Sequence, residues 1–303
     1  MSARYLLPYA PDAIGGLPVG LDALVWDGDG PLPADEELRE VEFFCLPYMR
    51  HAAALPLIGR LPSLKVVQTL TAGMDDVLPH VPDGVVACNA RGLHDASTAE
   101  LAVTLILASL RGVPHFTRLQ DRGRWQQEFH QSLADKTVLI LGYGSIGRAL
   151  AARLEPFECE VVRVARRARP DEGVHGTEEL TALLPSADVV VLLTPLTPES
   201  RHLVDAGFLA RMKDGALLVN VARGPVVDTP ALLAELTAQR LRAALDVTDP
   251  EPLPADHPLW HAPGVLITPH VGGPSSAFLP RAKRTLRRQV LRFENGEPLA
   301  PGH

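Results

Sequence analysis

The N-terminal part of the chain alternates short apolar runs with polar or proline-containing segments. Four runs rich in Val, Leu and Phe lie at residues 21–27, 41–47, 64–71 and 85–90. Uninterrupted runs of this kind are typical of parallel strands that are covered on both faces of a sheet. The pattern therefore predicts a first domain in which these four segments form a buried parallel sheet.

A second and cleaner alternation of strand and helix patterns begins at Thr137. The six predicted strands are 137–141, 160–164, 188–193, 216–221, 242–247 and 265–269, and the helix patterns between them include 145–156, 177–185 and 229–240. Six strands in this order make two mononucleotide-binding halves of a doubly wound α/β sheet. The second domain is therefore predicted to be α/β as well.

Helix patterns also flank the second alternation. Residues 95–112 begin at Asp95, a good N-cap residue, and are apolar on nearly all sides. We expect such a helix to be buried between domains or between subunits. A polar arm follows it at 113–136, and a last helix pattern at 280–296 comes after all six strands. That last helix is predicted to return to the first domain.

Composition and charge exclude several classes of protein. The 303 residues carry 29 Lys and Arg against 36 Asp and Glu, a formal net charge of −7, which argues against nucleic-acid and membrane-surface binding. Cys45, Cys88 and Cys159 are odd in number and far apart, which fits reduced thiols. We find no apolar run of about 18 residues, no secretory leader pattern and no metal-ligand spacing. The sequence predicts a cytoplasmic protein without a metal.

A glycine-rich turn directly follows the strand pattern at 137–141. Residues 142–147 read GYGSIG, so Gly142, Gly144 and Gly147 have the G-x-G-x-x-G spacing at the start of a helix pattern. In a dinucleotide site the first glycine permits the tight turn, the second lets the backbone approach a pyrophosphate, and the third lets helix and strand pack closely. We expect the phosphates at the helix N-terminus, beside Tyr143, Ser145 and Ile146.

The end of the next strand pattern bears on which dinucleotide is bound. NAD sites carry an acidic residue about 20 residues after the first glycine. Here Ala165 stands 23 residues after Gly142, and Arg166 and Arg167 follow it. Arginines form charge-assisted bonds with a 2′-phosphate, so NADP is favoured. NAD remains the alternative if the two arginines are simply solvated.

Polar residues follow the last three predicted strands. Arg223 follows 216–221, Asp246 lies in 242–247, and His270 follows 265–269. Open α/β sheets bind their ligands at this edge. Glu251 precedes His270 by 19 residues and offers a carboxylate that would orient the ring and raise its pKa. Arg223 offers a planar fork for the carboxylate or carbonyl of a 2-keto acid.

With these motifs in place, the chain resembles the D-isomer-specific 2-hydroxyacid dehydrogenases over nearly its whole length. The matching segments are LTAGMDDV (70–77), STAE (97–100), LGYGSIGR (141–148), TPLTPESRHLV (194–204), MKDGALLVNVARGPVVD (212–228), ALDVTDPEPLPADHPLW (244–260) and ITPHVGG (267–273). The resemblance implies two doubly wound parallel-sheet domains with a cleft between them. A Rossmann NAD(P)-binding domain at 95–277 would be inserted into a flavodoxin-like substrate domain formed by 1–94 and 278–303.

The resemblance also implies roles for individual residues. His270 would exchange a proton with the substrate oxygen, supported by Glu251, while Arg223 binds and polarises the substrate and Asp246 holds the nicotinamide carboxamide. The Ala72–Gly73 turn would cradle the substrate carboxylate with backbone N–H groups, although an ordinary strand-to-helix turn would look the same. The remaining expected cofactor contacts are Thr98, Thr194, Pro195, Val221, Ala222 and Gly272.

The leading hypothesis is an NAD(P)-dependent reductase of small 2-keto acids, with glyoxylate and hydroxypyruvate as the expected substrates. The alternative is a corepressor-like protein of the same fold that senses the cofactor without turnover. The presence of Arg223, Glu251 and His270 favours catalysis. The apolar helix at 98–110 and the arm after it suggest a homodimer, as the resemblance also implies.

Overall fold

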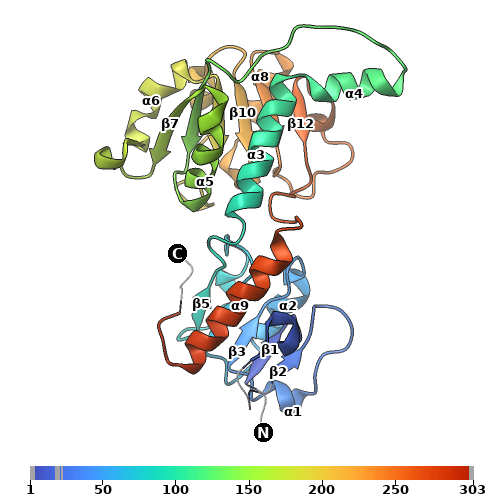
Figure 1. Ribbon diagram of the computed structural model, residues 1–303, viewed down its shortest axis with the longest axis vertical. Helices are drawn as coiled ribbons and strands as arrows, with labels where there is room; N and C mark the ends of the chain where they lie inside the picture. Colours follow the sequence, from blue (N-terminus) through green and yellow to red (C-terminus); the bar gives the residue numbers. More distant parts are fainter. Residues whose placement is uncertain (1–3, 18–20, 22, 300–303) are drawn as a thin grey trace. The chain divides into compact units, whose positions relative to one another are not determined.

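The computed structural model describes residues 4–17, 21 and 23–299. The chain divides into two compact units, one formed by Met1–His94 with Ser276–His303 and the other by Asp95–Ser275 (Figure 1). Both units are built on parallel sheets, so the predicted fold class is confirmed. The two units are described separately below.

The sheet of the first unit has five parallel strands in the order β2-β1-β3-β4-β5, which is the flavodoxin-like order. The strands are β1 (Tyr5–Leu7), β2 (Ala23–Val25), β3 (Phe43–Cys45), β4 (Val66–Gln68) and β5 (Val86–Cys88). The prediction of four strands was wrong, because β1 was missed. Its apolar run is short and is followed by Pro8, yet its three residues are fully buried between two neighbours. Asp22, within the predicted strand at 21–27, lies outside the described residues.

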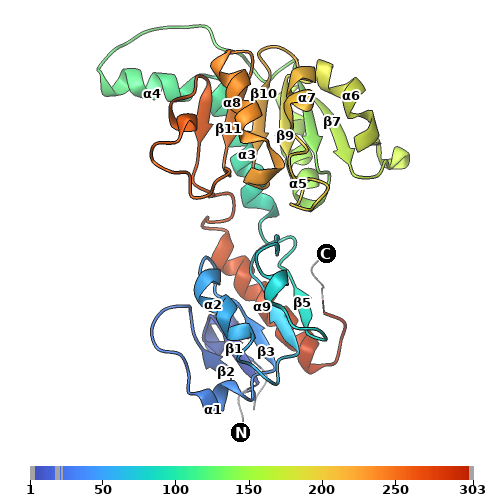
Figure 2. The ribbon, with the colours of Figure 1, turned by 180° about the vertical axis from the view of Figure 1, so that it is seen from behind.

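Helices cover both faces of this sheet. On one face α1 (Asp35–Leu38) and α2 (His51–Ile58) pack against apolar side chains of the strands, among them Leu6 and Phe44 (Figure 2). On the other face α9 (Phe278–Glu294) packs against Tyr5 and Phe43. The short 3₁₀ helices are η1 (Pro11–Ile14) and η2 (Leu78–His80). The predicted last helix therefore belongs to this unit.

The sheet of the second unit has seven parallel strands in the order β12-β11-β10-β9-β6-β7-β8. They are β6 (Thr137–Leu141), β7 (Glu160–Ala165), β8 (Val174–Gly176), β9 (Val189–Leu192), β10 (Leu217–Asn220), β11 (Arg242–Leu245) and β12 (Val265–Ile267). The six-strand prediction missed β8, an edge strand of three residues with no apolar repeat. With β8 counted third, the strands follow the Rossmann order, and β12 is added at one edge.

Helices again cover both faces. One face carries α3 (Asp95–Leu110) and α5 (Ser145–Leu154), and the other carries α6 (Leu180–Leu183), α7 (Ala206–Arg211) and α8 (Thr229–Thr237) (Figures 1 and 2). The arm contains α4 (Val113–Asp121). The 3₁₀ helices are η3 (Glu155–Phe157), η4 (Pro170–Glu172), η5 (Thr177–Glu179), η6 (Leu184–Ser186), η7 (Gly224–Val226) and η8 (Pro258–His261). One side of α3, including Leu105 and Ile106, is buried in the core of its own unit.

The described residues contain neither a single membrane-spanning helix nor a metal-binding cluster. None of the described helices is by itself long and apolar enough to span a membrane; α3 and α4 together, which meet at a bend of 67°, satisfy the length and composition test. Within residues 4–17, 21 and 23–299, no three His, Cys, Asp or Glu side chains are grouped so that they can hold a metal ion. Cys45, Cys88 and Cys159 are free thiols.

Candidate active site

The glycine-rich turn after β6 shows a different environment at each glycine. Gly142 has a φ of +110°, and a Cβ atom there would lie 2.5 Å from the Leu193 backbone carbon. A Cβ atom on Gly147 would lie 2.7 Å from the Gly142 carbonyl oxygen, whereas one on Gly144 would meet no described atom within 4 Å. The first and third glycines are therefore required by packing, and the second borders open space that a ligand can enter.

The helix after this turn begins without a side-chain cap. Gly144 is the N-cap residue of α5, so the first N–H groups of the helix point at the turn without an intrahelical acceptor. The Thr194 hydroxyl is buried nearby in the fold, after β9, and has no hydrogen-bond partner among the described residues. Unpaired donors at a helix N-terminus, open space at Gly144 and an orphaned hydroxyl fit the pyrophosphate end of a dinucleotide.

Ser145 has a partner that sequence reasoning did not find. Its hydroxyl donates to the carboxylate of Asp95, the first residue of α3, at 3.1 Å. The bond joins the start of α3 to the start of α5, and it fixes the Ser145 side chain at the edge of the turn. The two residues are 50 positions apart, so no local spacing could have indicated the contact.

Arginines gather at the end of β7, but the arrangement is wider than expected. Arg166 and Arg167 are exposed beyond the strand. Arg169, which we did not predict, donates to the Tyr143 carbonyl at 2.9 Å. The guanidinium groups of Arg148, Arg163 and Arg169 all lie within 6 Å of the Tyr143 ring centre, which is within cation–π range. Three guanidinium groups therefore surround Tyr143 of the glycine-rich turn, and those of Arg148 and Arg169 are ion-paired with Glu172.

His270 and Glu251 form a hydrogen-bonded pair beyond the carboxyl ends of β11 and β12. The His270 Nδ1 donates to Glu251 Oε1 at 2.6 Å. This bond raises the pKa of His270 and outweighs partial burial and the Arg223 charge, which lower it. Burial disfavours the Glu251 carboxylate, but the bond and the positive charges of His270 and Arg223 keep the pKa of Glu251 below its ordinary value. His270 is thus suited to hold a proton near neutrality.

Asp246 fixes the backbone around His270. The buried carboxylate accepts the Thr268 hydroxyl at 2.6 Å, the Val271 N–H at 2.8 Å and the Gly272 N–H at 2.9 Å. The Asp246 carbonyl also accepts the His270 N–H at 2.8 Å. His270 has a φ of +53°, a left-handed conformation that non-glycine residues adopt only where the surroundings impose it. The role of Thr268 was not predicted.

The turn that carries Arg223 lies against the turn that leads to Glu251. Asn220 braces the Arg223 turn, because its amide donates to the Arg223 carbonyl and accepts the Ala222 N–H, both at 3.0 Å. A Cβ atom on Gly224 would overlap the Thr248 carbonyl group. The missing side chain therefore allows the backbones after β10 and β11 to touch. Arg223 acts electrostatically on both His270 and Glu251.

The other predicted cofactor residues lie in the same unit. The Thr98 hydroxyl of α3 donates to the Gly272 carbonyl at 3.2 Å, and the Ser200 hydroxyl donates to the Pro195 carbonyl at 2.7 Å. Val221 and Ala222 are buried at the end of β10. Ile146 is half-buried in the first turn of α5. These hydrogen bonds order the loops that follow β9 and β12.

The Ala72–Gly73 turn belongs to the first unit and follows β4. Both residues are half-buried, and the structure shows no acceptor for their backbone N–H groups among the described residues. Unpaired N–H groups on successive residues form a concavity that attracts anions. The geometry suits a carboxylate ligand.

Comparisons with known proteins point to one family. The model of the "D-isomer specific 2-hydroxyacid dehydrogenase, NAD binding domain" family matches residues 103–272. Human glyoxylate reductase/hydroxypyruvate reductase is 32% identical over 290 residues, covering 90% of this chain and 88% of the human protein. Glyoxylate reductase of Thermofilum pendens is 33% identical over 286 residues, with 89% and 84% coverage.

A solved structure is similar along the whole chain. It is the D-isomer specific 2-hydroxyacid dehydrogenase of Xanthobacter autotrophicus Py2, in complex with NADPH and MES. It has a TM-score of 0.80 and 33% sequence identity, and the match covers 99% of this chain and 98% of that chain. The likeness includes both units.

Proposed function

Because the chain belongs to the D-isomer specific 2-hydroxyacid dehydrogenase family, we propose that it reduces small 2-keto acids to 2-hydroxy acids with NADPH. That it is an NAD(P)-dependent oxidoreductase follows from its relatives, which do not favour the cofactor-sensing alternative. Glyoxylate and hydroxypyruvate are the proposed substrates, after the names of the relatives. The observation that carries the proposal is the His270–Glu251 pair near Arg223.

The proposed roles divide between the two units. We assign residues 95–277 to dinucleotide binding, and residues 1–94 with 278–303 to substrate binding. The backbone N–H groups of Ala72 and Gly73 bind the substrate carboxylate, and the Arg223 guanidinium binds and polarises the 2-keto group. The cysteine content supports a cytoplasmic location.

A bound nicotinamide cofactor supplies the hydride that reduces the keto carbon. His270, as the imidazolium, donates its Nε2 proton to the keto oxygen, because Nδ1 is engaged by Glu251. Glu251 keeps the ring oriented and protonated. In the oxidative direction neutral His270 takes the hydroxyl proton. Asp246 holds the His270 loop, and its proposed contact with the nicotinamide carboxamide would come in addition to the bonds described above.

NADP is the proposed cofactor because no acidic residue stands in the sequence at the end of β7, where the exposed Arg166 and Arg167 offer guanidinium groups to a 2′-phosphate. The double variant Arg166→Ala/Arg167→Ala should raise the KM for NADPH about tenfold or more, because charge-assisted hydrogen bonds to the 2′-phosphate are lost. The KM for NADH should stay nearly unchanged. An equal effect on both cofactors would contradict the assignment.

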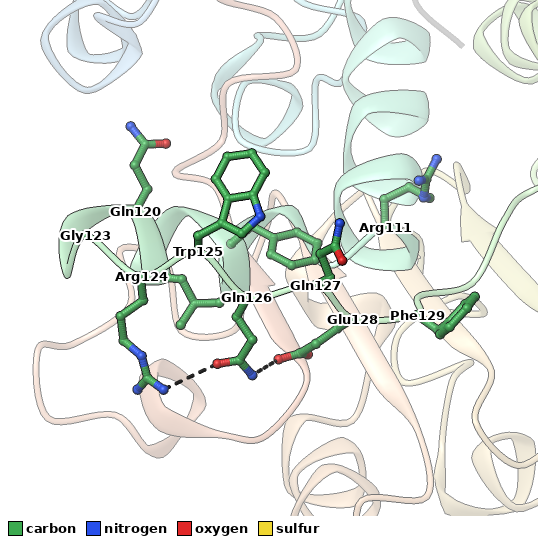
Figure 3. Close-up of a pocket in the computed structure, with 11 residues that line it drawn as sticks. Arg111, Gln120, Gly123, Arg124, Trp125, Gln126, Gln127, Glu128 and Phe129 are labelled. Carbon is green, nitrogen blue, oxygen red and sulfur yellow. Dashed lines mark hydrogen bonds between the residues drawn. The ribbon is translucent and has the colours of Figure 1, made fainter.

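We propose a second copy of this chain as the partner of the arm. A groove of about 910 Å³ is lined by the end of α3, by α4 and by residues 123–129, and Trp125 and Phe129 stand out beside it (Figure 3). Trp125 is 94% exposed, which is unusual for a large aromatic side chain. Light scattering should give a dimer mass, and Trp125→Ala with Phe129→Ala should shift it toward the monomer.

The decisive test is oxidation of NADPH and NADH, followed at 340 nm, against glyoxylate, hydroxypyruvate, pyruvate, phenylpyruvate and 2-ketoisocaproate. We expect turnover with the two smallest acids and a preference for NADPH. Binding of NADPH without turnover of any of these acids would overturn the proposed reaction and point to the sensing alternative.

A further inference from the structure

The buried polar side chains of the first unit all serve one turn. Among the described residues, five polar side chains are buried in this unit: Gln68, Thr69, Asn89, His94 and Gln289. A buried polar group destabilises the fold unless it is hydrogen-bonded, so such a set has to be satisfied locally. Here the set surrounds the segment Thr69–Gly73, which follows β4 and ends in the Ala72–Gly73 turn described above.

Five successive backbone carbonyls in this segment accept a side-chain hydrogen bond. The Gln68 amide donates to the Thr69 carbonyl at 2.7 Å, and His94 Nε2 pairs with the Leu70 carbonyl at 2.9 Å. A carbonyl can only accept, so His94 Nε2 carries the hydrogen. The Thr69 hydroxyl donates to the Thr71 carbonyl at 3.1 Å.

The two carbonyls nearest the concavity are held in the same way. The Asn89 amide donates to the Ala72 carbonyl at 3.0 Å, and the Thr71 hydroxyl donates to the Gly73 carbonyl at 2.7 Å. The Gln289 amide of α9 donates to the Gln68 side-chain oxygen at 2.8 Å and so fixes the orientation of the Gln68 amide. This last bond joins residues 221 positions apart in the sequence.

A peptide whose carbonyl is held on one side presents its N–H on the other, because the peptide unit is planar and trans. We propose that the side-chain donors around Thr69–Gly73 are positioning residues that fix the polarity of this turn, so that the Ala72 and Gly73 N–H groups are preorganised for the substrate carboxylate. Asn89 is the central member, because its amide holds the Ala72 peptide and its side-chain oxygen accepts the Arg91 N–H at 3.2 Å. The inference rests on the proposed function for the identity of the anion.

The sharpest variant is Asn89→Asp, which keeps the shape of the side chain and its acceptor for Arg91. It replaces the donor facing the Ala72 carbonyl with an acceptor and adds a negative charge behind the turn. Thr69→Val is a second, uncharged variant that removes the hydroxyl bonded to the Thr71 carbonyl. Val67→Ala is the matched control, since Val67 is buried in β4 and its side chain makes no hydrogen bond to the turn.

The measurements are calorimetric binding of oxalate, a non-reducible analogue of glyoxylate, to the NADPH-saturated protein, together with KM, kcat and Tm. Asn89→Asp should raise the Kd for oxalate and the KM for glyoxylate about tenfold, while kcat and the KM for NADPH change less than about twofold. Thr69→Val should raise the same two quantities about threefold. Val67→Ala should lower Tm and leave oxalate binding unchanged.

The outcomes separate this inference from the proposed function. Unchanged oxalate affinity in Asn89→Asp, with a lower Tm, would show a purely structural role and overturn the inference, as would an equal loss of affinity in Val67→Ala. Absence of oxalate binding by the wild type would also overturn it. A wild type that binds oxalate but reduces no 2-keto acid would overturn the proposed reaction alone, and the ratio between Asn89→Asp and the wild type would still decide the inference.

Discussion

Two turns of this molecule are held in place by opposite kinds of hydrogen bond. At Thr268–Gly272 a single buried acceptor, the Asp246 carboxylate, collects the N–H groups of Val271 and Gly272 and the Thr268 hydroxyl. At Thr69–Gly73 several side-chain donors, namely amides, hydroxyls and an imidazole, bind the backbone carbonyls instead. The first arrangement uses up the N–H groups of Val271 and Gly272, and the second leaves those of Ala72 and Gly73 without a backbone acceptor among the described residues.

The difference matches what each turn offers a ligand. A turn whose N–H groups are already bonded can present only a side chain, and Thr268–Gly272 presents the His270 ring. A turn whose carbonyls are bonded presents its N–H groups, which suit an anion whatever side chains stand there. Proton transfer needs a titratable side chain, whereas holding a carboxylate does not, so the two supports correspond to the two proposed tasks.

The largest effect is expected from removing the side chain that the Asp246-held turn presents. His270→Gln should lower kcat about 10²- to 10⁴-fold, the usual contribution of a positioned general acid. The affinity for NADPH, measured by fluorescence titration, should stay within about twofold because the glycine-rich turn is untouched. A parallel loss of cofactor affinity would argue against a specific role in proton transfer.

A third turn, Gly142–Gly147, offers N–H groups as the Ala72–Gly73 turn does, and its glycines provide a matched pair. Gly144→Ala places a methyl group in open space, so Tm should be unchanged while the Kd for NADPH rises about 10- to 100-fold, the equivalent of overpacking a contact by 1–3 kcal/mol. Gly142→Ala should lower Tm first, because the added carbon meets the Leu193 backbone. If Gly144→Ala bound NADPH normally, the backbone at Gly144 would not approach the cofactor.

Changing the acceptor tests the support of the His270 turn directly. Asp246→Asn keeps the shape but turns one acceptor into a donor that faces backbone N–H groups. We expect a loss of about 2–3 kcal/mol in the free energy of unfolding, since hydrogen bonds to a buried charge are among the stronger ones. The kcat should fall about tenfold as His270 loses its alignment. Urea unfolding and steady-state kinetics measure the two effects separately.

The pH profile tests the partner of His270. In the reductive direction the imidazolium is required, and Glu251 raises the pKa of His270, so activity persists to a higher pH than an isolated histidine would allow. Glu251→Gln removes that support, and the alkaline limb of kcat/KM for glyoxylate should move to lower pH. At neutral pH the rate should fall by up to about tenfold. An unchanged limb would show that another group controls it.

The smallest effect is expected at the Ala72–Gly73 turn, from Thr71→Val. The variant removes the hydroxyl that holds the Gly73 carbonyl and keeps the size of the side chain. The lost bond holds the Gly73 carbonyl, whose peptide carries the Met74 N–H and not those of Ala72 and Gly73, so the KM for glyoxylate should rise only about twofold with little change in kcat. A change confined to kcat would break the comparison, because it would link this turn to the chemical step.

Much of the second unit could be predicted because its signals are local. Gly142, Gly144 and Gly147 lie within six residues after a strand, and Arg223 and His270 each follow a strand whose carboxyl end lies at the ligand-binding edge. The strand β1 was missed because Pro8 follows its short apolar run, and β8 was missed because Val174 is its only large apolar residue.

The supporting contacts could not be predicted for a different reason. The bonds from Gln289 to Gln68 and from Ser145 to Asp95 join residues 221 and 50 positions apart. Such residues come together only because two elements pack against each other. The presence of an amide or hydroxyl side chain in the sequence does not indicate which residue it will bond. The residues proposed to act could therefore be found in the sequence, whereas these long-range supporting contacts became visible only in the structure.

The contact at Gly224 has a consequence for reading mutational scans. Any side chain at this position would collide with the Thr248 backbone, so every substitution should be strongly depleted in a saturation library selected for activity. Variants at position 224 would be depleted as strongly as variants at His270, although a glycine has no side chain that could take part in the reaction. Depletion at this site would reflect the close packing of two neighbouring loops and not a catalytic role. A parallel measurement of protein abundance would distinguish loss of folding from loss of activity.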